Sequence, residues 1–263
     1  MFEDLRHPII STKQIRLYTG SGNKTLARRI AEILNLELSG LELKKFSNGE
    51  IYARFDETVR GCEVFFIQSM SGENVNDLLM ETLIACDAAK RASCRSFTAV
   101  IPHYAYARQD RKASSREPIT ARLIANLLEA AGVDRVLSVD LHQGQIQGFF
   151  DIPVNHLTAL YHFGDYFSAK NFDPDTTVVL SPDVGRAKAA KKLGDYLGLP
   201  IAIAHKGRPR HNAAEVMGII GDIKGKTCII NDDMIDTGGT LVSNIFKLKE
   251  MGAGDIYISA THG

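Results

Sequence analysis

Short apolar runs rich in β-branched residues alternate along this chain with longer segments of helical periodicity, and this alternation constrains the fold more than any other feature. The runs that predict strands are residues 15–19, 64–68, 97–101, 136–139, 178–180, 201–204, 228–231 and 256–260. The segments whose apolar positions share one helical face are residues 24–36, 75–92, 120–131, 187–197 and 240–251. Strands that alternate with helices form mostly parallel sheets flanked by helices, because each crossover returns over a face of the sheet. The sequence therefore predicts an α/β protein.

The order of these elements occurs twice. The strands at 15–19 and 178–180 each lead through a short turn into a helix. Each half then continues with a buried strand, a helix and a further strand, and a histidine stands at or just after the end of that strand. Any two strand–helix–strand runs share part of this order, so a tandem duplication is a hypothesis; it gives domains 1–152 and 153–263. The second half ends at Gly263 before any counterpart of the 120–131 helix, so we expect it to lack its C-terminal tail, whether trimmed or naturally shortened.

The charges of the chain balance, with 31 Lys and Arg against 31 Asp and Glu in 263 residues. A neutral chain does not hold nucleic acid or an anionic membrane through its overall charge. No apolar run approaches the roughly 20 residues that span a bilayer, and the N-terminus lacks the order of a signal peptide. The four scattered cysteines fit reduced core positions. The sequence therefore predicts a cytoplasmic protein with no nucleic-acid or membrane partner.

The most specific segment is residues 229–240, where a buried strand ends in Asp232 and Asp233 and a small-residue loop at 236–240 opens a helix. Free backbone N–H groups and threonine hydroxyls at a helix N-terminus suit a phosphate, and the paired acids can take sugar hydroxyls directly or through Mg²⁺. The alternative is an ordinary turn in which Asp236 or Thr237 caps the helix. Three acids and two glycines exceed what a cap needs. The corresponding loop of the first half, 69–73, lacks the paired acids, so only the second half is predicted to hold a sugar phosphate.

Two segments are strongly basic. The cations of the first are Arg108, Arg111, Lys112, Arg116 and Arg122. The second, 205–211, carries Lys206, Arg208 and Arg210 on a loop that contains glycine and proline. Arginine makes planar, bidentate contacts to phosphate, so the first segment could clamp a triphosphate and the second could close over phosphates as a mobile loop. Solvated basic loops are the alternative for both.

Asp140 and His142 follow the strand at 136–139 and alternate to the same side beyond its C-terminal end, where ligands of α/β proteins bind. A histidine with carboxylates can hold a divalent ion that already carries phosphate ligands. A single Asp-x-His is weak evidence, and a structural histidine is the alternative.

Several stretches of this chain resemble the ribose-phosphate pyrophosphokinases, over about residues 17–263. The stretches that match are Lys45-Phe46-Ser47-Asn48-Gly49-Glu50, Ala107-Arg108-Gln109-Asp110-Arg111-Lys112, residues 115–120, Asp140-Leu141-His142, residues 145–153, Ser181-Pro182-Asp183, Glu215-Val216-Met217 and residues 232–240. The resemblance implies two tandem phosphoribosyltransferase-like domains, the first on the ATP side and the second on the ribose 5-phosphate side. It implies transfer of the diphosphate of ATP to the C1 hydroxyl of ribose 5-phosphate for nucleotide biosynthesis, with Mg²⁺ as cofactor.

The same resemblance implies roles for single residues. Lys206 and Arg208 match the mobile catalytic loop, where their charges would stabilise the transferred phosphate. The residues implied for ribose 5-phosphate are Arg208, Asp232, Asp233, Asp236, Thr237, Gly238, Gly239 and Thr240. Those implied for ATP are Phe46, Asn48, Gly49, Glu50, Arg108 and Gln109. Those implied for the metal are His142, Asp183, Asp140 and Asp151. Family members self-associate as dimers assembled into hexamers, and the Phe46 loop often comes from a neighbouring subunit.

The chain departs from the family pattern at three positions. Arg186 stands where the family usually has a second glycine after Gly185, Asn155 where it often has an aspartate, and His103 where tyrosine is more usual. Two other functions compete with the synthetase: a non-catalytic regulatory paralogue, and an ordinary phosphoribosyltransferase that needs no ATP. The Lys-x-Arg pair at 206–208 and the paired acids argue against the first, and the adenine-side segments argue against the second.

Overall fold

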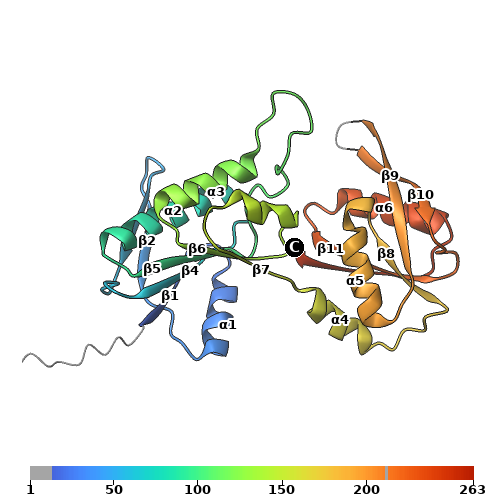
Figure 1. The fold of residues 1–263 in the computed structure, drawn as a ribbon, viewed down its shortest axis with the longest axis horizontal. Coiled ribbons are helices and arrows are strands. Elements are labelled where there is room, and N and C mark those ends of the chain that lie inside the picture. The colour runs from blue at the N-terminus through green and yellow to red at the C-terminus, as the bar shows by residue number, and fades with distance from the viewer. Residues whose placement is uncertain (1–13, 211–212) are drawn as a thin grey trace, which may run out of the picture. The chain divides into compact units, whose positions relative to one another are not determined.

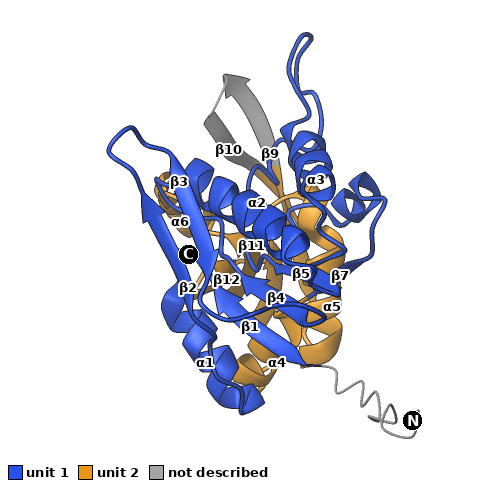
Figure 2. Cartoon of the chain, turned by 90° about the vertical axis from the view of Figure 1, so that its left-hand side faces the viewer, with its two compact units in different colours: residues 1–157 blue, residues 158–263 orange. Residues whose placement is uncertain are grey.

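The computed structural model of this protein describes residues 14–210 and 213–263, without the side chains of residues 206–210, 213–217 and Thr240. The chain folds into two compact units, one ending at Leu157 and one beginning at Thr158 (Figure 2). The sequence places the domain boundary between residues 152 and 153. Strand β7 (Val154–Leu157) pairs with the preceding strand, which explains why residues 154–157 belong to unit 1.

Unit 1 is built on a five-stranded parallel sheet with the order β1-β4-β5-β6-β7 (Figure 1). The strands that precede β7 are β1 (Ile15–Thr19), β4 (Glu63–Ile67), β5 (Ser96–Val100) and β6 (Arg135–Val139). The helices are α1 (Lys24–Leu34), α2 (Val75–Arg91) and α3 (Thr120–Ala131). Val64 and Phe66 pack with α2 and α3, whereas Phe65 and Ile67 pack with α1 on the opposite face. This alternation along β4 confirms a sheet flanked by helices.

Unit 2 repeats this architecture with the sheet order β10-β9-β8-β11-β12. The strands are β8 (Thr177–Ser181), β9 (Ile201–Arg210), β10 (Ala213–Ile220), β11 (Thr227–Met234) and β12 (Ile256–His262). The helices are α4 (Leu160–Ser168), α5 (Ala187–Leu197) and α6 (Gly239–Glu250). Only β10 is antiparallel to its neighbour. Val179 and Ile229 pack against α4 and α5, while Cys228 and Ile230 share a core with α6.

The strand order supports the duplication hypothesis. Strands β1, β4 and β5 neighbour one another in the same order and direction as β8, β11 and β12. In both units an antiparallel hairpin follows the helix that comes after the first strand: β2 (Leu41–Lys45) with β3 (Ile51–Phe55) follows β1 and α1 in unit 1, and β9 with β10 follows β8 and α5 in unit 2. Just before β2, Leu38 forms a parallel bridge to Leu17, as the start of β9 does to β8. The hairpins therefore occupy equivalent places in the two copies.

One sequence prediction about secondary structure is wrong. Residues 205–210, predicted as a loop, continue β9, because they pair with the returning strand β10 from Ala213 onward. Gly207 and Pro209 are tolerated there because β8 pairs with β9 only over residues 201–203. The missing N–H of Pro209 therefore removes no hydrogen bond between β9 and β8. The sequence also missed the β2–β3 hairpin, β7, α4 and β10. Among the described residues, no helix is long and apolar enough to cross a membrane.

A buried carboxylate closes the turn after β1. Glu81, on α2, accepts hydrogen bonds from the Ser21 backbone N–H at 2.9 Å, the Ser21 hydroxyl at 2.7 Å and Gln68 Nε2 at 2.6 Å. Gln68 Oε1 accepts in turn from the Gly22 N–H at 2.9 Å. A Cβ at Gly22 would lie 2.4 Å from the Ser69 carbonyl oxygen, so this close approach requires glycine. An internal anion thus fills the position after the first strand of unit 1.

Replacing Glu81 with alanine is expected to destabilise unit 1 by about 1–3 kcal/mol, because it leaves a donor of the buried Gln68 amide without its acceptor and removes the hydrogen bonds of Ser21. Hydrogen exchange of β1 and α2 amides measures this loss within unit 1. Glu73→Ala, at an exposed glutamate just before α2, is the matched control. Equal protection in the two variants would contradict a structural role for the carboxylate.

Candidate active site

Two carboxylates lie at the end of β11, in the core of unit 2. The strand predicted to end at residue 231 runs on to Met234 and so includes both acids. Asp233 is only 3% exposed in its side chain and Asp232 is 28% exposed, so the pair faces opposite sides of the strand end with unequal access to solvent. The Asp233 N–H donates to Asp232 Oδ1 at 2.9 Å, and the Ile235 N–H donates to the His262 carbonyl at 2.8 Å. Pairing with β12 therefore fixes the strand up to the acids.

Arg186 connects this strand end with the turn after β8. Its backbone N–H donates to Asp183 Oδ1 at 3.0 Å, and its side chain is 17% exposed. Its Nε lies 3.6 Å from Asp232 Oδ1, and one terminal nitrogen lies 3.9 Å from Asp233 Oδ1. The structure thus brings the predicted residues Asp183, Asp232 and Asp233 to one edge of the sheet. The sequence identified Arg186 only as a departure from a glycine, because its partners are far away along the chain.

The protonation of Asp232 is shifted by its surroundings. The pKa of Asp232 is raised to about 6, because burial and the neighbouring Asp233 raise it by more than the positive charge of Arg186 lowers it. Burial is the largest cause. A carboxyl group with this pKa can change its protonation near neutral pH, which suits a residue that holds sugar hydroxyls.

The loop after the acids leads directly into α6. Gly238 is the N-cap residue and has φ 74°, a left-handed conformation that favours glycine. The N-cap position is therefore held by glycine, which has no side chain to cap the helix. Asp236 and Thr237 are exposed, and Thr240 lies in the first turn, where backbone N–H groups have no partner within the helix. This geometry can receive a phosphate.

The predicted catalytic residues Lys206 and Arg208 lie on β9, but their side chains are outside the described part of the chain. Their backbone pairs with β10 near Val216 and Glu215. Their predicted roles stay predictions.

In unit 1 the tip of the β2–β3 hairpin presents Phe46, Asn48, Gly49 and Glu50. The Phe46 N–H donates to the Glu50 carbonyl at 2.8 Å, and the Glu50 N–H donates to Asn48 Oδ1 at 3.1 Å. Gly49 has φ 91°, which this tight turn requires. The Phe46 ring is 45% exposed and meets Tyr52 only by an edge, at 6.0 Å between centroids. Lys44 Nζ lies over the ring at 5.7 Å from its centroid, and the exposed part of the ring is available to stack on a base.

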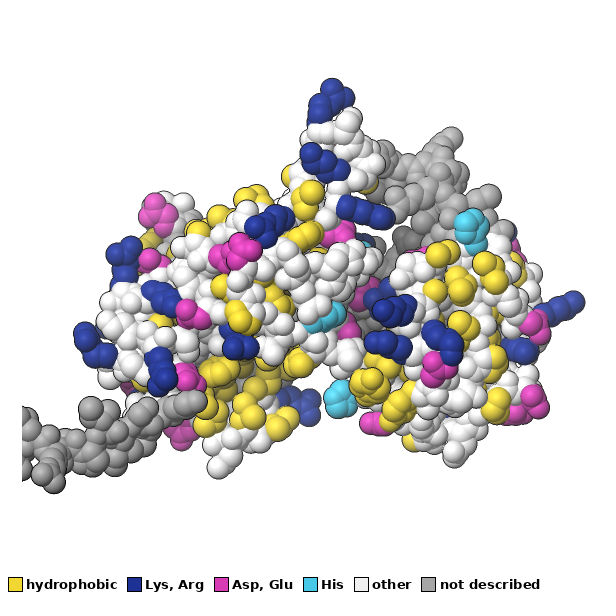
Figure 3. All heavy atoms as spheres, viewed as in Figure 1, with side chains coloured by type: hydrophobic (Ala, Val, Ile, Leu, Met, Phe, Trp, Pro, Cys, Tyr) yellow, Lys and Arg dark blue, Asp and Glu magenta, His cyan; other side chains and the backbone are white. Residues whose placement is uncertain are grey.

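The basic segment lies between β5 and α3, where Lys and Arg side chains gather on a projecting loop (Figure 3). Arg108 is exposed. Gln109 accepts from the Thr120 hydroxyl at 2.5 Å, and its carbonyl accepts from the Ala121 N–H at 3.1 Å, which ties the loop to α3. Arg122 instead donates to the Phe149 carbonyl, so it supports the fold rather than the loop.

The candidate metal ligands divide between the units, with Asp183 in unit 2 and the others in unit 1. Asp140 has φ 43°, a strained conformation at a strand end, and its N–H donates to the Leu157 carbonyl at 2.9 Å. His142 lies two residues on, half-buried. Asp151 is 84% exposed and lies 3.8 Å from Arg122, at a distance typical of a loose ion pair. Its role as a metal ligand has the least support from geometry.

No three His, Cys, Asp or Glu side chains of the described residues gather as a metal site. Mg²⁺ needs no such cluster, since it is usually held by one or two carboxylates together with waters and substrate phosphates. Carboxylates at strand ends therefore fit this ion. The sequence missed His156, whose Nε2 accepts from the Leu141 N–H at 3.0 Å and orients the loop between Asp140 and His142. Burial lowers the pKa of His156 and keeps its ring neutral for this bond.

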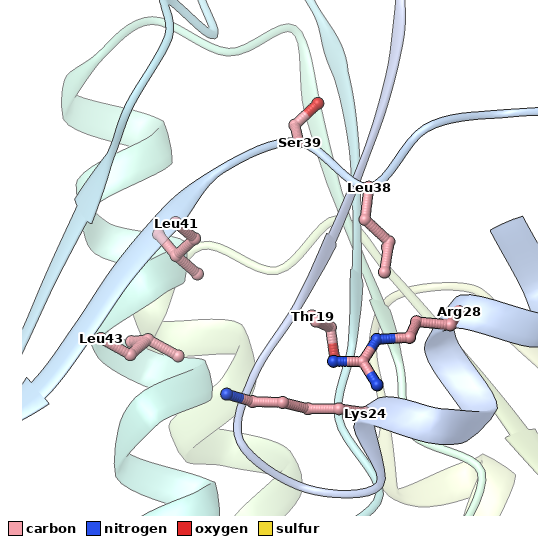
Figure 4. Close-up of a pocket in the computed structure, with 7 residues that line it drawn as sticks. All are labelled: Thr19, Lys24, Arg28, Leu38, Ser39, Leu41 and Leu43. Carbon is pink, nitrogen blue, oxygen red and sulfur yellow. The ribbon is translucent and has the colours of Figure 1, made fainter.

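Unit 1 also contains a cavity of about 200 Å³ beside α1 (Figure 4). The Lys24 and Arg28 side chains extend from the helix toward Thr19, opposite three leucines. The lining residues are Thr19, Lys24, Arg28, Leu38, Ser39, Leu41 and Leu43. None of them is a predicted site residue.

Comparisons with known proteins cover almost the whole chain. Residues 15–132 match a family model described as the N-terminal domain of ribose phosphate pyrophosphokinase, and residues 155–261 match the phosphoribosyl transferase domain. The chain is 53% identical over 253 residues to a ribose-phosphate pyrophosphokinase of Clostridium perfringens, which covers 96% of this chain and 79% of that protein. It is 50% identical over 250 residues to the Bacillus subtilis protein of the same name, covering 95% and 78%.

A solved structure gives the same result for the fold. The phosphoribosylpyrophosphate synthetase of Mycobacterium smegmatis matches with a TM-score of 0.88 and 47% sequence identity, over 95% of this chain and 82% of that one.

The pKa of Asp232 predicts a stability that depends on pH. Because the folded pKa of about 6 lies above the ordinary value of 3.8, the fold favours the protonated form, and the free energy of unfolding falls as pH rises from about 4 through 6. Asp232→Asn mimics the protonated form, so this variant is expected to be more stable than the parent at pH 7, by at most about 3 kcal/mol, but not at pH 4. Urea denaturation across this range measures the difference. Asp255→Asn, at an exposed position, is the control, and parallel pH profiles for parent and D232N would refute the assignment.

Proposed function

The chain belongs to the ribose-phosphate pyrophosphokinase family, and we propose that it performs the family's reaction, transferring the diphosphate of ATP to the C1 hydroxyl of ribose 5-phosphate. The products are 5-phosphoribosyl 1-pyrophosphate and AMP, a step in nucleotide biosynthesis. The observation that carries this function is identity near 50% to enzymes of that name over more than nine-tenths of the chain. No observation favours the regulatory paralogue.

Unit 2 holds the sugar phosphate in this proposal. The 5-phosphate is received by the loop and first turn around Gly238, where backbone N–H groups and the helix dipole favour an anion. Asp232 and Asp233 accept hydrogen bonds from the ribose hydroxyls and so orient C1. The remaining residues proposed for this subsite are Arg208, Asp236, Thr237, Gly239 and Thr240.

Unit 1 holds the adenine end of ATP. The exposed ring of Phe46 stacks on the base, and the turn that Asn48, Gly49 and Glu50 form offers polar atoms to its edge. Arg108 and Gln109 complete the site from the loop before α3. In a dimer-based hexamer, as the family resemblance implies, the hairpin would serve a neighbouring subunit.

The reaction displaces AMP at the β-phosphorus, so negative charge spreads over the non-bridging oxygens. Lys206 and Arg208, which β9 and β10 carry as a hairpin, supply cations for that charge. When bound, Mg²⁺ neutralises phosphate charge; each unit offers candidate ligands of its own, His142 with Asp140 and Asp151 in unit 1, and Asp183 in unit 2. Asp183 also positions the turn after β8 by accepting from the Arg186 N–H.

Release of AMP from ATP tests the function directly. The purified chain with Mg²⁺ is expected to release AMP only when ribose 5-phosphate is present, and to form one 5-phosphoribosyl 1-pyrophosphate per AMP. AMP without the sugar would indicate an unrelated hydrolysis. No AMP at all, with intact binding of ATP, would favour the regulatory paralogue.

Replacing Lys206 with alanine is expected to lower kcat by about 100- to 1,000-fold, because the cation acts on charge that develops in the transition state. The dissociation constant for ribose 5-phosphate is expected to change by less than about twofold. Calorimetry measures the binding and AMP release measures the turnover. Lys192→Ala, an exposed lysine on α5, is the control, and near-normal turnover in K206A would refute the role.

A further inference from the structure

The cavity beside α1 in unit 1 combines two cations with an apolar wall (Figure 4). Lys24 and Arg28 stand four residues apart on α1, and both side chains extend toward Thr19 at the end of β1. The aliphatic wall opposite them consists of Leu38, Leu41 and Leu43. Positive charge on one side and apolar surface on the other suit an anion that carries an apolar group.

The surrounding protein does not neutralise these two cations. Among the residues whose side chains the structure describes, no carboxylate forms an ion pair with Lys24 or Arg28. Like charges four residues apart on a helix repel each other, and α1 has no acid in its first turn to offset them. The pair therefore costs the helix some stability without a partner of its own, which indicates that its counterion comes from outside the chain.

The internal repeat provides a comparison for this place in the fold. Helices α1 and α5 end in the same hydrogen bond: the Leu36 N–H donates to the Ala31 carbonyl, and the Leu199 N–H donates to the Gly194 carbonyl, both at 2.9 Å. Each helix then leads into the strand that pairs or bridges in parallel with the first strand of its unit. The two helices can therefore be aligned residue by residue.

In this alignment, unit 2 carries no equivalent pair of cations. Ala187 takes the place of Lys24, and Lys191 takes the place of Arg28. Lys191 forms an ion pair with Asp195, four residues further along α5. Arg28 also has an acid four residues further on, but its side chain extends into the cavity instead. The two cations without a partner at these positions are therefore particular to unit 1.

Charge and size narrow the ligand. Two full positive charges match a dianion, whereas a single carboxylate would leave one cation unbalanced. The planar fork of arginine and the ammonium of lysine both bind phosphate oxygens. The cavity, about 200 Å³, is smaller than the pockets of about 300–1,000 Å³ that take drug-sized ligands. A phosphate with a small organic group therefore fits better than a large nucleotide.

We propose that this cavity binds a small phosphate monoester whose organic group is apolar. Lys24 and Arg28 hold the phosphate, and the three leucines contact the organic group, which removes their apolar surface from water. The cavity shares no residue with the sites proposed for ATP and ribose 5-phosphate, so the inference does not rest on the proposed function.

Leucine-methyl NMR with phenyl phosphate as the probe tests this site. The probe carries a phosphate and an apolar ring, whereas inorganic phosphate lacks the ring and benzoate lacks the second charge. The methyl signals of Leu38, Leu41 and Leu43 are expected to shift and saturate with phenyl phosphate. Those of Leu128, which is fully buried in the core of unit 1, are expected to stay in place. Phenyl phosphate is expected to bind at least about threefold more tightly than either other anion.

Variants of α1 connect the signal to the two cations. Arg28→Gln and Lys24→Gln are each expected to weaken the binding of phenyl phosphate about tenfold. Arg29→Gln is the matched control, because Arg29 is an exposed arginine on the same helix that does not line the cavity; its affinity is expected to change less than about twofold. Glutamine is a good helix former, and thermal unfolding confirms that each variant folds.

Three results would overturn the proposal. The first is that the three leucine signals of the parent protein do not shift with phenyl phosphate. The second is an equal loss of affinity in R28Q and R29Q, because the effect would then come from the overall charge of the helix. The third is equal affinity for inorganic phosphate and phenyl phosphate, because the leucines would then contribute nothing and the ligand would not be an organic ester.

Discussion

Parallel pairing on both sides of β11 is the constraint on which the site depends. Because β8, β11 and β12 run in the same direction and are held in register, their carboxyl ends meet at one edge of the sheet. That edge therefore collects the turn with Asp183 and Arg186, the acids of β11 and the end of β12 at His262. The turn, the acids and the end of β12 come from three separate stretches of the sequence, and the parallel ladder brings them together. In unit 1, the parallel ladder does the same for Gln68, His103 and Asp140.

The two units share one architecture but carry different side chains at the places where ligands are proposed to bind. In each, a hairpin follows the helix that comes after the first strand, and the functional residues proposed for that hairpin lie at or near its turn: Phe46 to Glu50 in unit 1, Lys206 and Arg208 in unit 2. An aromatic ring suits a base and cations suit phosphates, so the same projecting element is adapted by its side chains. The turn after the first strand differs in the same way, with Glu81 against one and Arg186 within the other.

The sequence predicted most of the regular structure because burial there is periodic. The helices Thr120–Ala131 and Ala187–Leu197 have the bounds that the pattern predicts. The sequence did not predict the elements and contacts that depend on residues far away along the chain. The β2 and β3 strands are short and half-exposed, and the β9 extension is created by pairing with β10 across Gly207 and Pro209. Motifs located the acids and the phosphate loop. No local pattern could reveal that Arg186 reaches Asp232, or that His156 supports the Asp140 loop, because both contacts exist only after folding.

Charge balance explains why the acids and Arg186 belong together. A site that receives a sugar phosphate and a diphosphate must hold negative ligands beside Asp232 and Asp233, which repel them. Burial and the neighbouring acid already raise the pKa of Asp232, so a proton can reduce that repulsion. Arg186 reduces it further with a permanent charge at 3.6 Å. The proton on Asp232 and the charge of Arg186 thus bring the strand end closer to neutral, which lets two neighbouring carboxylates remain together at the end of β11.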